Sequence, residues 1–210
     1  MNFRRATMPG LCLALAVLLP AFPARAAAPD VPHAQTYRVL GALLQSLRAG
    51  EPLEPIRAHA RSIAPRLAQL GSKYRVDLPS RLESAFTSGS RSEVMRAALL
   101  AGLLETRFSV ESVARDELTG WQAAKANAAR AFQAYDAISP SARAFDAPCH
   151  AGVMDSFMEL IGSLSEADLT TAPGRIEIPK RKLLRGLNFL SEKAVPANVP
   201  DARGGGVAAP

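Results

Sequence analysis

The sequence has few cysteines and few long apolar runs. Cys12 and Cys149 are the two cysteines among 210 residues. Cys12 falls in an amino-terminal segment that we expect to be removed, so the mature chain has one cysteine and no internal disulfide. The longest apolar run, residues 11–19, has nine residues. A membrane-spanning helix needs about 20, so we expect the mature chain not to span a membrane.

Motifs of several catalytic classes are also missing. The three histidines, His33, His59 and His150, are too far apart to place two metal ligands on one helix face. The sequence has no Gly-rich phosphate loop and no Gly-x-Ser-x-Gly turn around a nucleophilic serine. These absences argue against a zinc enzyme, a nucleotide-binding protein and a serine hydrolase. We therefore expect a protein that is not an enzyme.

The first 26 residues have the three parts of a secretory signal peptide. Arg4 and Arg5 precede the apolar run, Pro20 and Pro23 follow it, and residues 24–26 read Ala-Arg-Ala. Removal of residues 1–26 lowers the net charge from +6 to +3. This moderate charge does not indicate a nucleic-acid-binding protein, and the leader predicts a periplasmic or secreted location.

The mature chain divides into a helical domain with a short segment at each end. Residues 27–33 form a small, proline-bearing lead, and residues 194–210 form a tail rich in Pro, Gly and Ala. Both carry too little apolar surface to offset the entropy lost on ordering, so we expect them to be flexible or disordered. Residues 34–193 contain no linker and predict one helical domain. The alternative is two parts, with helices up to about Thr87 and helices from Ser90 on, because residues 87–90, Thr-Ser-Gly-Ser, form a flexible junction.

Apolar residues within that domain recur at helical spacing. Tyr37, Leu40, Leu44 and Leu47 step by three or four residues. A capping box at residues 90–93, Ser-Arg-Ser-Glu, predicts the start of a long helix. With short connections and no alternating strand pattern, the sequence predicts an all-α fold, an antiparallel helical bundle of six or seven helices.

Three details of this bundle follow from proline and from local pattern. Pro65 interrupts an apolar stripe and should kink or split the helix that carries it. Ser139-Pro140 should end the alanine-rich helix that begins near Trp121. Residues 175–178, Arg-Ile-Glu-Ile, are strand-like, and we expect the last helix to span residues 179–193.

Carboxylates on two of these helices are candidate ligands for a hard cation such as ferric iron. Glu105 and Glu111 flank the middle of the long helix, and Asp155 and Glu159 are four residues apart on one face of a later helix. His150 is the fifth candidate metal ligand. The alternative is that these carboxylates lie on ordinary solvated faces, where nearby basic side chains pair with them.

Cys149 and His150 are adjacent and allow a second kind of site. A c-type haem is attached through Cys-x-x-Cys-His, but Asp146 takes the place of the first thiol here, so a haem would have one thioether bond. Neighbouring residues on a helix point about 100° apart, which disfavours His150 as the base for a Cys149 nucleophile. An inner-face cysteine beside an edge histidine is the structural alternative.

The last predicted helix and the residues before it are basic. A basic amphipathic helix can lie on anionic lipid or dock on an acidic partner, although surface helices often have this balance too. The candidate docking residues are Arg175, Lys180, Arg181, Lys182 and Arg185.

Three segments resemble a helical module of bacterial iron-uptake systems, namely the imelysin-like EfeO proteins and the extracytoplasmic part of FTR-type iron permeases. They are VMRAALLAGLLETRFSVESVARDEL at 94–118, AAKANAARAFQAYDAISPSARAFDA at 123–147 and MDSFMELIGSL at 154–164. The resemblance implies a periplasmic bundle that binds or passes iron beside a membrane protein complex, without catalysis. The chain departs from these modules in one respect. Imelysin-like proteins carry a His-x-x-Glu metal motif, and no histidine of this chain has a glutamate three residues further on.

The sequence therefore predicts an exported, non-catalytic helical binding or accessory protein, with iron uptake or handling as its specific role and iron as the metal. One alternative is an interaction module that docks on a membrane or a membrane protein complex through its basic last helix. A further alternative is a c-type haem protein that uses Cys149 and His150.

Overall fold

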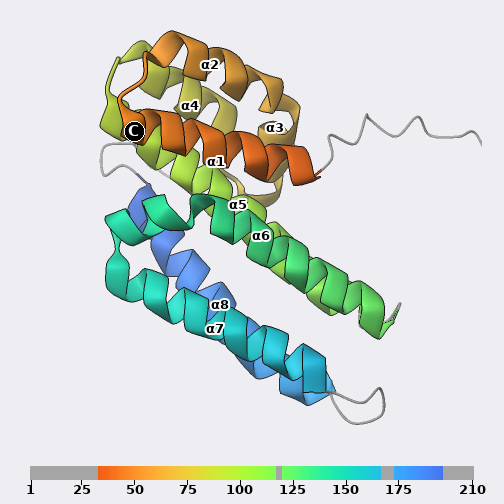
Figure 1. Cartoon of the computed structure of the whole chain (residues 1–210). Helices are drawn as coiled ribbons and strands as arrows, with labels where there is room; N and C mark the ends of the chain where they lie inside the picture. The colour runs from red at the N-terminus through yellow and green to blue at the C-terminus, as the bar shows by residue number, and fades with distance from the viewer. Residues whose placement is uncertain (1–32, 117–119, 167–172, 196–210) are drawn as a thin grey trace, which may run out of the picture. The chain divides into compact units, whose positions relative to one another are not determined.

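The computed structural model describes residues 33–116, 120–166 and 173–195 (Figure 1). The predicted signal peptide at 1–26 lies outside the described residues, as do residues 27–32 of the lead and 196–210 of the tail. The first helix already begins at His33, and the last ends at Ala194, so the helical domain extends one residue beyond the predicted boundary at each end.

The described residues are helical throughout and contain no strand, which confirms the all-α prediction. They hold eight helices, where the sequence predicts six or seven. These are α1 (His33–Ala49), α2 (Leu53–Ser62), α3 (Ala64–Tyr74), α4 (Leu78–Thr87), α5 (Arg91–Asp116), α6 (Trp121–Phe145), α7 (Ala147–Glu166) and α8 (Pro173–Ala194).

The eighth helix arises because the stripe that contains Pro65 is split. α2 ends at Ser62, and Ile63 leaves helical geometry with φ −105° and ψ 5°. Pro65 then lies in the first turn of α3, where its missing N–H has no intrahelical acceptor to lose. The predicted effect of Pro65 is confirmed.

Two other predictions are wrong: the end of a helix at Pro140, and the strand-like segment before a last helix that begins at residue 179. α6 continues through Pro140 to Phe145, and Ile138 and Ala142 on either side of the proline are fully buried. Residues 175–178 are helical rather than strand-like, because α8 begins at Pro173 and contains Pro179. In both cases burial of apolar side chains around the proline outweighs the loss of one backbone hydrogen bond.

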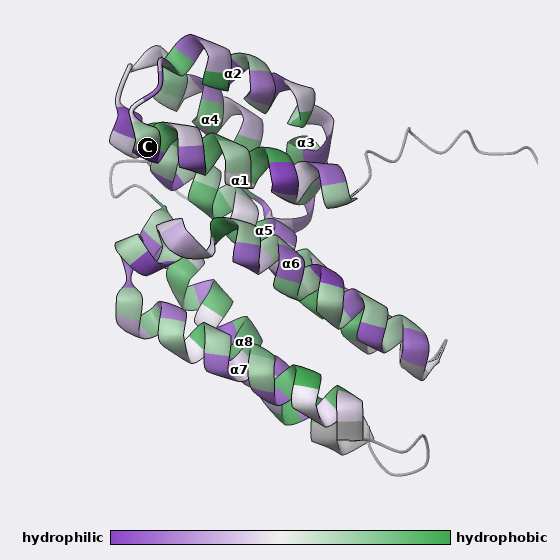
Figure 2. Ribbon diagram, in the orientation of Figure 1, coloured by the Kyte–Doolittle hydropathy of each residue, from purple (hydrophilic) through white to green (hydrophobic). Residues whose placement is uncertain are grey.

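The long helix α5 is the centre of the domain. Its residues 97–106 are buried without interruption, and it contacts α1, α3, α4, α6 and α8. A helix surrounded on all sides needs a continuous apolar surface rather than one stripe. The other helices are amphipathic, and Figure 2 shows hydrophilic and hydrophobic residues alternating around α6, α7 and α8.

The capping box before α5 forms only in part. The Ser90 hydroxyl accepts a hydrogen bond from the Glu93 backbone N–H at 3.4 Å, as the motif requires. The Glu93 carboxylate accepts from the Ser88 hydroxyl at 2.7 Å. It thereby ties the start of α5 to the end of α4.

Glycines let neighbouring helices approach closely. A Cβ atom placed on Gly41 of α1 would lie 2.9 Å from the Ala137 carbonyl oxygen of α6. One placed on Gly186 of α8 would lie 2.7 Å from a methyl carbon of Val153 on α7. By contrast, a Cβ on Gly162 of α7 would meet no atom within 4 Å.

The substitution Gly41→Ala should lower the free energy of unfolding by about 1–2 kcal/mol, because overpacking against a backbone carbonyl exceeds the gain in helix propensity. The matched substitution Gly162→Ala should raise it by up to about 1 kcal/mol, because only the propensity gain remains. Urea unfolding followed by circular dichroism measures both. Equal effects of the two substitutions would contradict the close α1–α6 contact.

Candidate functional site

Glu105, the first predicted metal ligand, is fully buried and bound by an arginine. Its two carboxylate oxygens accept hydrogen bonds from Arg66 Nε at 2.9 Å and Nη2 at 3.2 Å. The Arg66 side chain is 5% exposed, and its guanidinium also lies 4.4 Å from the centre of the Phe108 ring. The pair joins α3 to α5, so the structure gives Glu105 a role inside the core.

Glu111, the second predicted ligand, is half-buried and lies six residues further along α5. It accepts from Lys73 Nζ at 2.5 Å, from Arg107 Nε at 2.8 Å and from the Tyr74 hydroxyl at 3.2 Å. Burial acts to raise the pKa of the Glu111 carboxyl, but the hydrogen bonds and charges of Lys73 and Arg107 outweigh it and leave this pKa below its ordinary value. The carboxylate is therefore held between two cations.

The other three predicted metal ligands lie on α7. Asp155 is exposed, and Glu159 accepts from Lys182 Nζ of α8 at 2.9 and 3.0 Å. His150 Nδ1 lies 3.0 Å from the Tyr135 hydroxyl of α6. The part of the chain that the structure describes contains no group of three or more His, Cys, Asp or Glu side chains that could hold a metal ion. The structure thus does not bring the five candidates together.

Cys149 and His150 point to different helices. The Cys149 thiol lies 3.7 Å from the Gly186 carbonyl oxygen of α8, while the His150 ring stacks beside Tyr135 of α6 with ring centres 5.8 Å apart. Burial and the charge of Asp146 raise the pKa of the Cys149 thiol, and burial lowers the pKa of His150. The structure offers no hydrogen bond between the two side chains that would activate the thiol.

The predicted basic residues of α8 are not equivalent. Lys180 is buried against the bundle and paired with Glu177 at 2.9 Å, so its inclusion among the docking residues is corrected. Arg181 and Lys182 are exposed and paired with Glu177 and Glu159. Arg185 is exposed and makes no ion pair with the described residues. Arg175 lies in the first turns of α8, and its side chain is outside the described part of the structure.

Sequence reasoning missed two apolar side chains on the same side of α8. Ile178 is 63% exposed and Phe189 is 49% exposed. Residues 178, 182, 185 and 189 are spaced by four, three and four positions, so they lie along one face of the helix. A helical projection from residue 173 onward would have found this stripe, but the strand-like reading of residues 175–178 removed Ile178 from the helix.

We call the exposed side of this helix the α8 outer face; it comprises Ile178, Arg181, Lys182, Arg185 and Phe189. The opposite side of α8 packs into the core through Ile176, Leu183, Leu187 and Leu190, which are buried. None of the helices within the described residues is long and apolar enough to cross a membrane.

Comparisons with protein-family models, with curated proteins and with solved structures give no match for this chain. The resemblance to iron-uptake modules stays a prediction from the residues themselves. The arrangement of side chains in the described structure therefore provides the argument for function.

Replacing Glu105 by Ala should lower the free energy of unfolding by about 3–5 kcal/mol, because it leaves a buried guanidinium without its carboxylate. The double substitution Arg66→Met, Glu105→Leu should recover most of this loss, since neither charge is then buried. Urea unfolding of the single and double variants measures the difference. A loss below 1 kcal/mol for Glu105→Ala would show that the pair is not buried.

The Cys149 thiol should react with iodoacetamide severalfold more slowly than a free cysteine at pH 8, because its raised pKa leaves less thiolate at that pH. The rate should increase with pH to a point above the ordinary pKa of cysteine. The urea-unfolded protein is the control and should react at the ordinary rate. Equal rates in the folded and unfolded protein would contradict the burial of the thiol.

Proposed function

We propose that the protein is an exported, non-catalytic accessory module that docks on an anionic membrane surface through the α8 outer face. In this proposal the helices form an antiparallel bundle that serves as a rigid support, and the protein acts in the periplasm or outside the cell. The membrane location would place it beside a membrane protein complex.

The observation that carries the proposal is the combination of cations and exposed apolar side chains on one helix face. Arg181, Lys182 and Arg185 lie between Ile178 and Phe189 along α8. A helix that lies in the membrane interface buries apolar side chains among the acyl chains while its Lys and Arg contact lipid phosphates. The α8 outer face has both components in one continuous stripe.

The ion pairs on this face do not prevent lipid binding. Arg181 is 65% exposed and Lys182 is 53% exposed, and their partners Glu177 and Glu159 are 37% and 50% exposed. Exposed pairs of this kind contribute only about 0–1 kcal/mol each. A lipid phosphate can therefore replace the carboxylate at little cost.

A third exposed apolar residue lies on the neighbouring helix. Met158 of α7 is 61% exposed and precedes Glu159, which contacts Lys182 across the α7–α8 interface. Adjacent residues on a helix point about 100° apart, so Met158 is not part of the α8 outer face. This surface is outside the packed core, so docking requires no unfolding of the bundle.

The same geometry gives less support to iron handling. Glu105 and Glu111 are paired with basic side chains in or near the core, and Asp155, Glu159 and His150 do not form a ligand cluster in the described residues. Docking is for this reason the function that the side chains favour. Iron handling by a partner complex at the membrane would be compatible with it.

Sedimentation with lipid vesicles tests the proposal. The protein should bind phosphatidylcholine vesicles that contain phosphatidylglycerol and should dissociate as salt is raised, because the attraction is electrostatic in part. The double variant Arg181→Gln, Arg185→Gln should bind about 30-fold more weakly, since each cation near an anionic surface contributes about 1 kcal/mol.

A matched control changes the same charge elsewhere. Arg96 of α5 and Arg130 of α6 are exposed and lie outside the α8 outer face, so Arg96→Gln, Arg130→Gln should bind like the original protein. Phe189→Ser should weaken binding while leaving its salt dependence, because it removes only the apolar contact. Equal binding to neutral and anionic vesicles, or equal loss in both double variants, would refute docking through α8.

A further inference from the structure

An open pocket of about 620 Å³ lies between α2, α3 and α4, far from α8 in the sequence. Small-molecule sites in proteins are typically clefts of about 300–1,000 Å³. Its lining comes from residues within the segments 57–67 and 79–87. Its size alone allows a small organic ligand, and the chemistry of its lining determines which kind.

The floor of the pocket is apolar. Ala60 of α2, Leu67 of α3, and Leu82 and Phe86 of α4 line it, and each is buried to more than nine-tenths. These side chains belong to the hydrophobic core, so the pocket gives a ligand access to the edge of that core. A hydrocarbon body would be desolvated there at a gain proportional to its apolar area.

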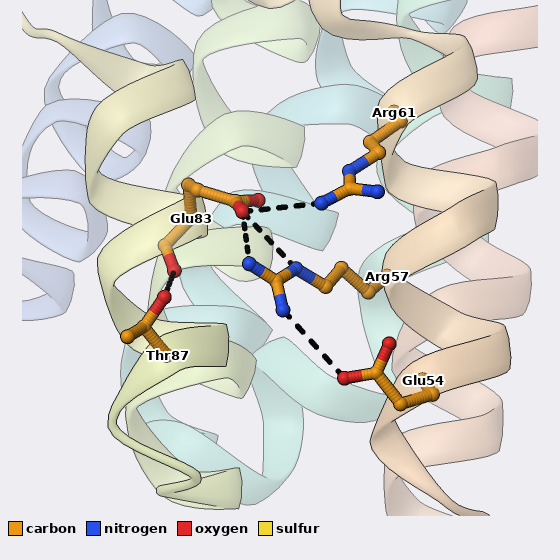
Figure 3. A network of polar contacts seen from close by, with 5 residues as sticks. All are labelled: Glu54, Arg57, Arg61, Glu83 and Thr87. Atoms are coloured by element: carbon orange, nitrogen blue, oxygen red, sulfur yellow. Dashed lines mark hydrogen bonds and ion pairs between the residues drawn. The ribbon is translucent and has the colours of Figure 1, made fainter.

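The rim of the pocket is cationic on the α2 side. Arg57 and Arg61, one helical turn apart on α2, both point to the carboxylate of Glu83 on α4 (Figure 3). Arg57 Nε lies 3.1 Å and Arg61 Nη2 lies 3.3 Å from the same oxygen, Glu83 Oε1, which also accepts from Arg57 Nη2. Two guanidinium groups thus share one carboxylate oxygen.

The charges of the lining residues do not cancel. Arg57, Arg61 and Glu83 leave a net charge of +1 at the rim. Arg57 also approaches Glu54 at 3.6 Å, but that carboxylate is 84% exposed and lies outside the pocket lining. Hydrogen bonds from Arg57, and then from Arg61, hold the pKa of Glu83 below its ordinary value, so the site is built around a bound carboxylate.

We propose that this pocket binds a single-chain amphiphile with a carboxylate head, the chemistry of a fatty acid. The carboxylate of the ligand takes the place of the Glu83 side chain between Arg57 and Arg61, and the hydrocarbon chain lies on the floor formed by Leu67, Leu82 and Phe86. Guanidinium groups favour carboxylates because their N–H groups match the two oxygens.

The rim selects the charge of the ligand. A monoanion brings the net charge of the three rim side chains to zero, whereas a dianion would be repelled by Glu83, which stays on the pocket wall. A neutral alcohol of the same length would leave both guanidinium groups with Glu83 and would gain only the apolar contact. A small carboxylate without a chain would gain only the ion pairs, which are weak at an exposed rim.

Calorimetric titration of the purified protein with decanoate, at concentrations where decanoate is monomeric, tests the proposal. Decanoate should bind one molecule per chain, while decanol and acetate should each bind at least tenfold more weakly. The variant Arg61→Gln should bind decanoate severalfold more weakly, because an exposed ion pair contributes up to about 1 kcal/mol. Arg61 is 65% exposed, so this variant should keep the fold.

The variant Glu83→Gln gives the more specific result. It removes the internal carboxylate that competes with the ligand, so decanoate should bind about tenfold more tightly than to the original protein. Arg96→Gln, an exposed arginine on α5 outside the pocket lining, is the matched control and should leave the affinity unchanged. Circular dichroism of each variant establishes that it is folded.

Three outcomes would overturn the proposal. Decanol binding as tightly as decanoate would show that the arginines do not contact the ligand. Weaker decanoate binding to folded Glu83→Gln would show that Glu83 does not compete for the anion position. Equal losses in Arg61→Gln and Arg96→Gln would show a general effect of charge. The pocket and the α8 outer face share no residue, so each proposal fails independently of the other.

Discussion

Burial of the central segment of α5 on all sides is the constraint on which the rest of the structure depends. Residues 97–106 form ten consecutive buried positions, and five other helices pack against this segment or its ends. That segment has no solvated face, so each polar group on it must find a partner inside the protein. Thr106 and Ser109 donate to backbone carbonyls four residues earlier, and Glu105 binds Arg66.

The Arg66–Glu105 pair joins α3 to α5 inside the core. A buried guanidinium and carboxylate must remain together, because separation leaves an uncompensated charge in the core. α3 can therefore slide little along α5. The open pocket lies between α3 and its neighbours α2 and α4, with Arg57, Arg61 and Glu83 at its rim.

The carboxyl-terminal helices follow a different principle. α7 and α8 run antiparallel, since Glu159 contacts Lys182 while Asp146 contacts Lys193, and glycine permits their close approach at Gly186. Their inner faces are apolar and their outer faces carry exposed, weakly coupled charges. Such charges stabilise the fold little. They are consequently available for interactions with other molecules, as is the exposed Ile178 among them.

The sequence by itself determined the helical class, an interruption at Pro65, the inward stripes of most helices and the basic character of the last one, because these depend on local spacing and on the backbone chemistry of proline. Whether the interruption was a kink or a split was left to the tertiary structure. Only the tertiary structure decided the role of each charged residue. Glutamate and lysine are usually solvated, so nothing in the sequence indicates that Glu105 and Lys180 are buried. Packing between helices makes Glu105 the partner of Arg66 in the core and removes Lys180 from the surface. The meeting of Arg57 and Arg61 with Glu83 joins residues more than twenty positions apart. The packing of α2, α3 and α4 brings these side chains together in space, and no local sequence pattern predicts that contact.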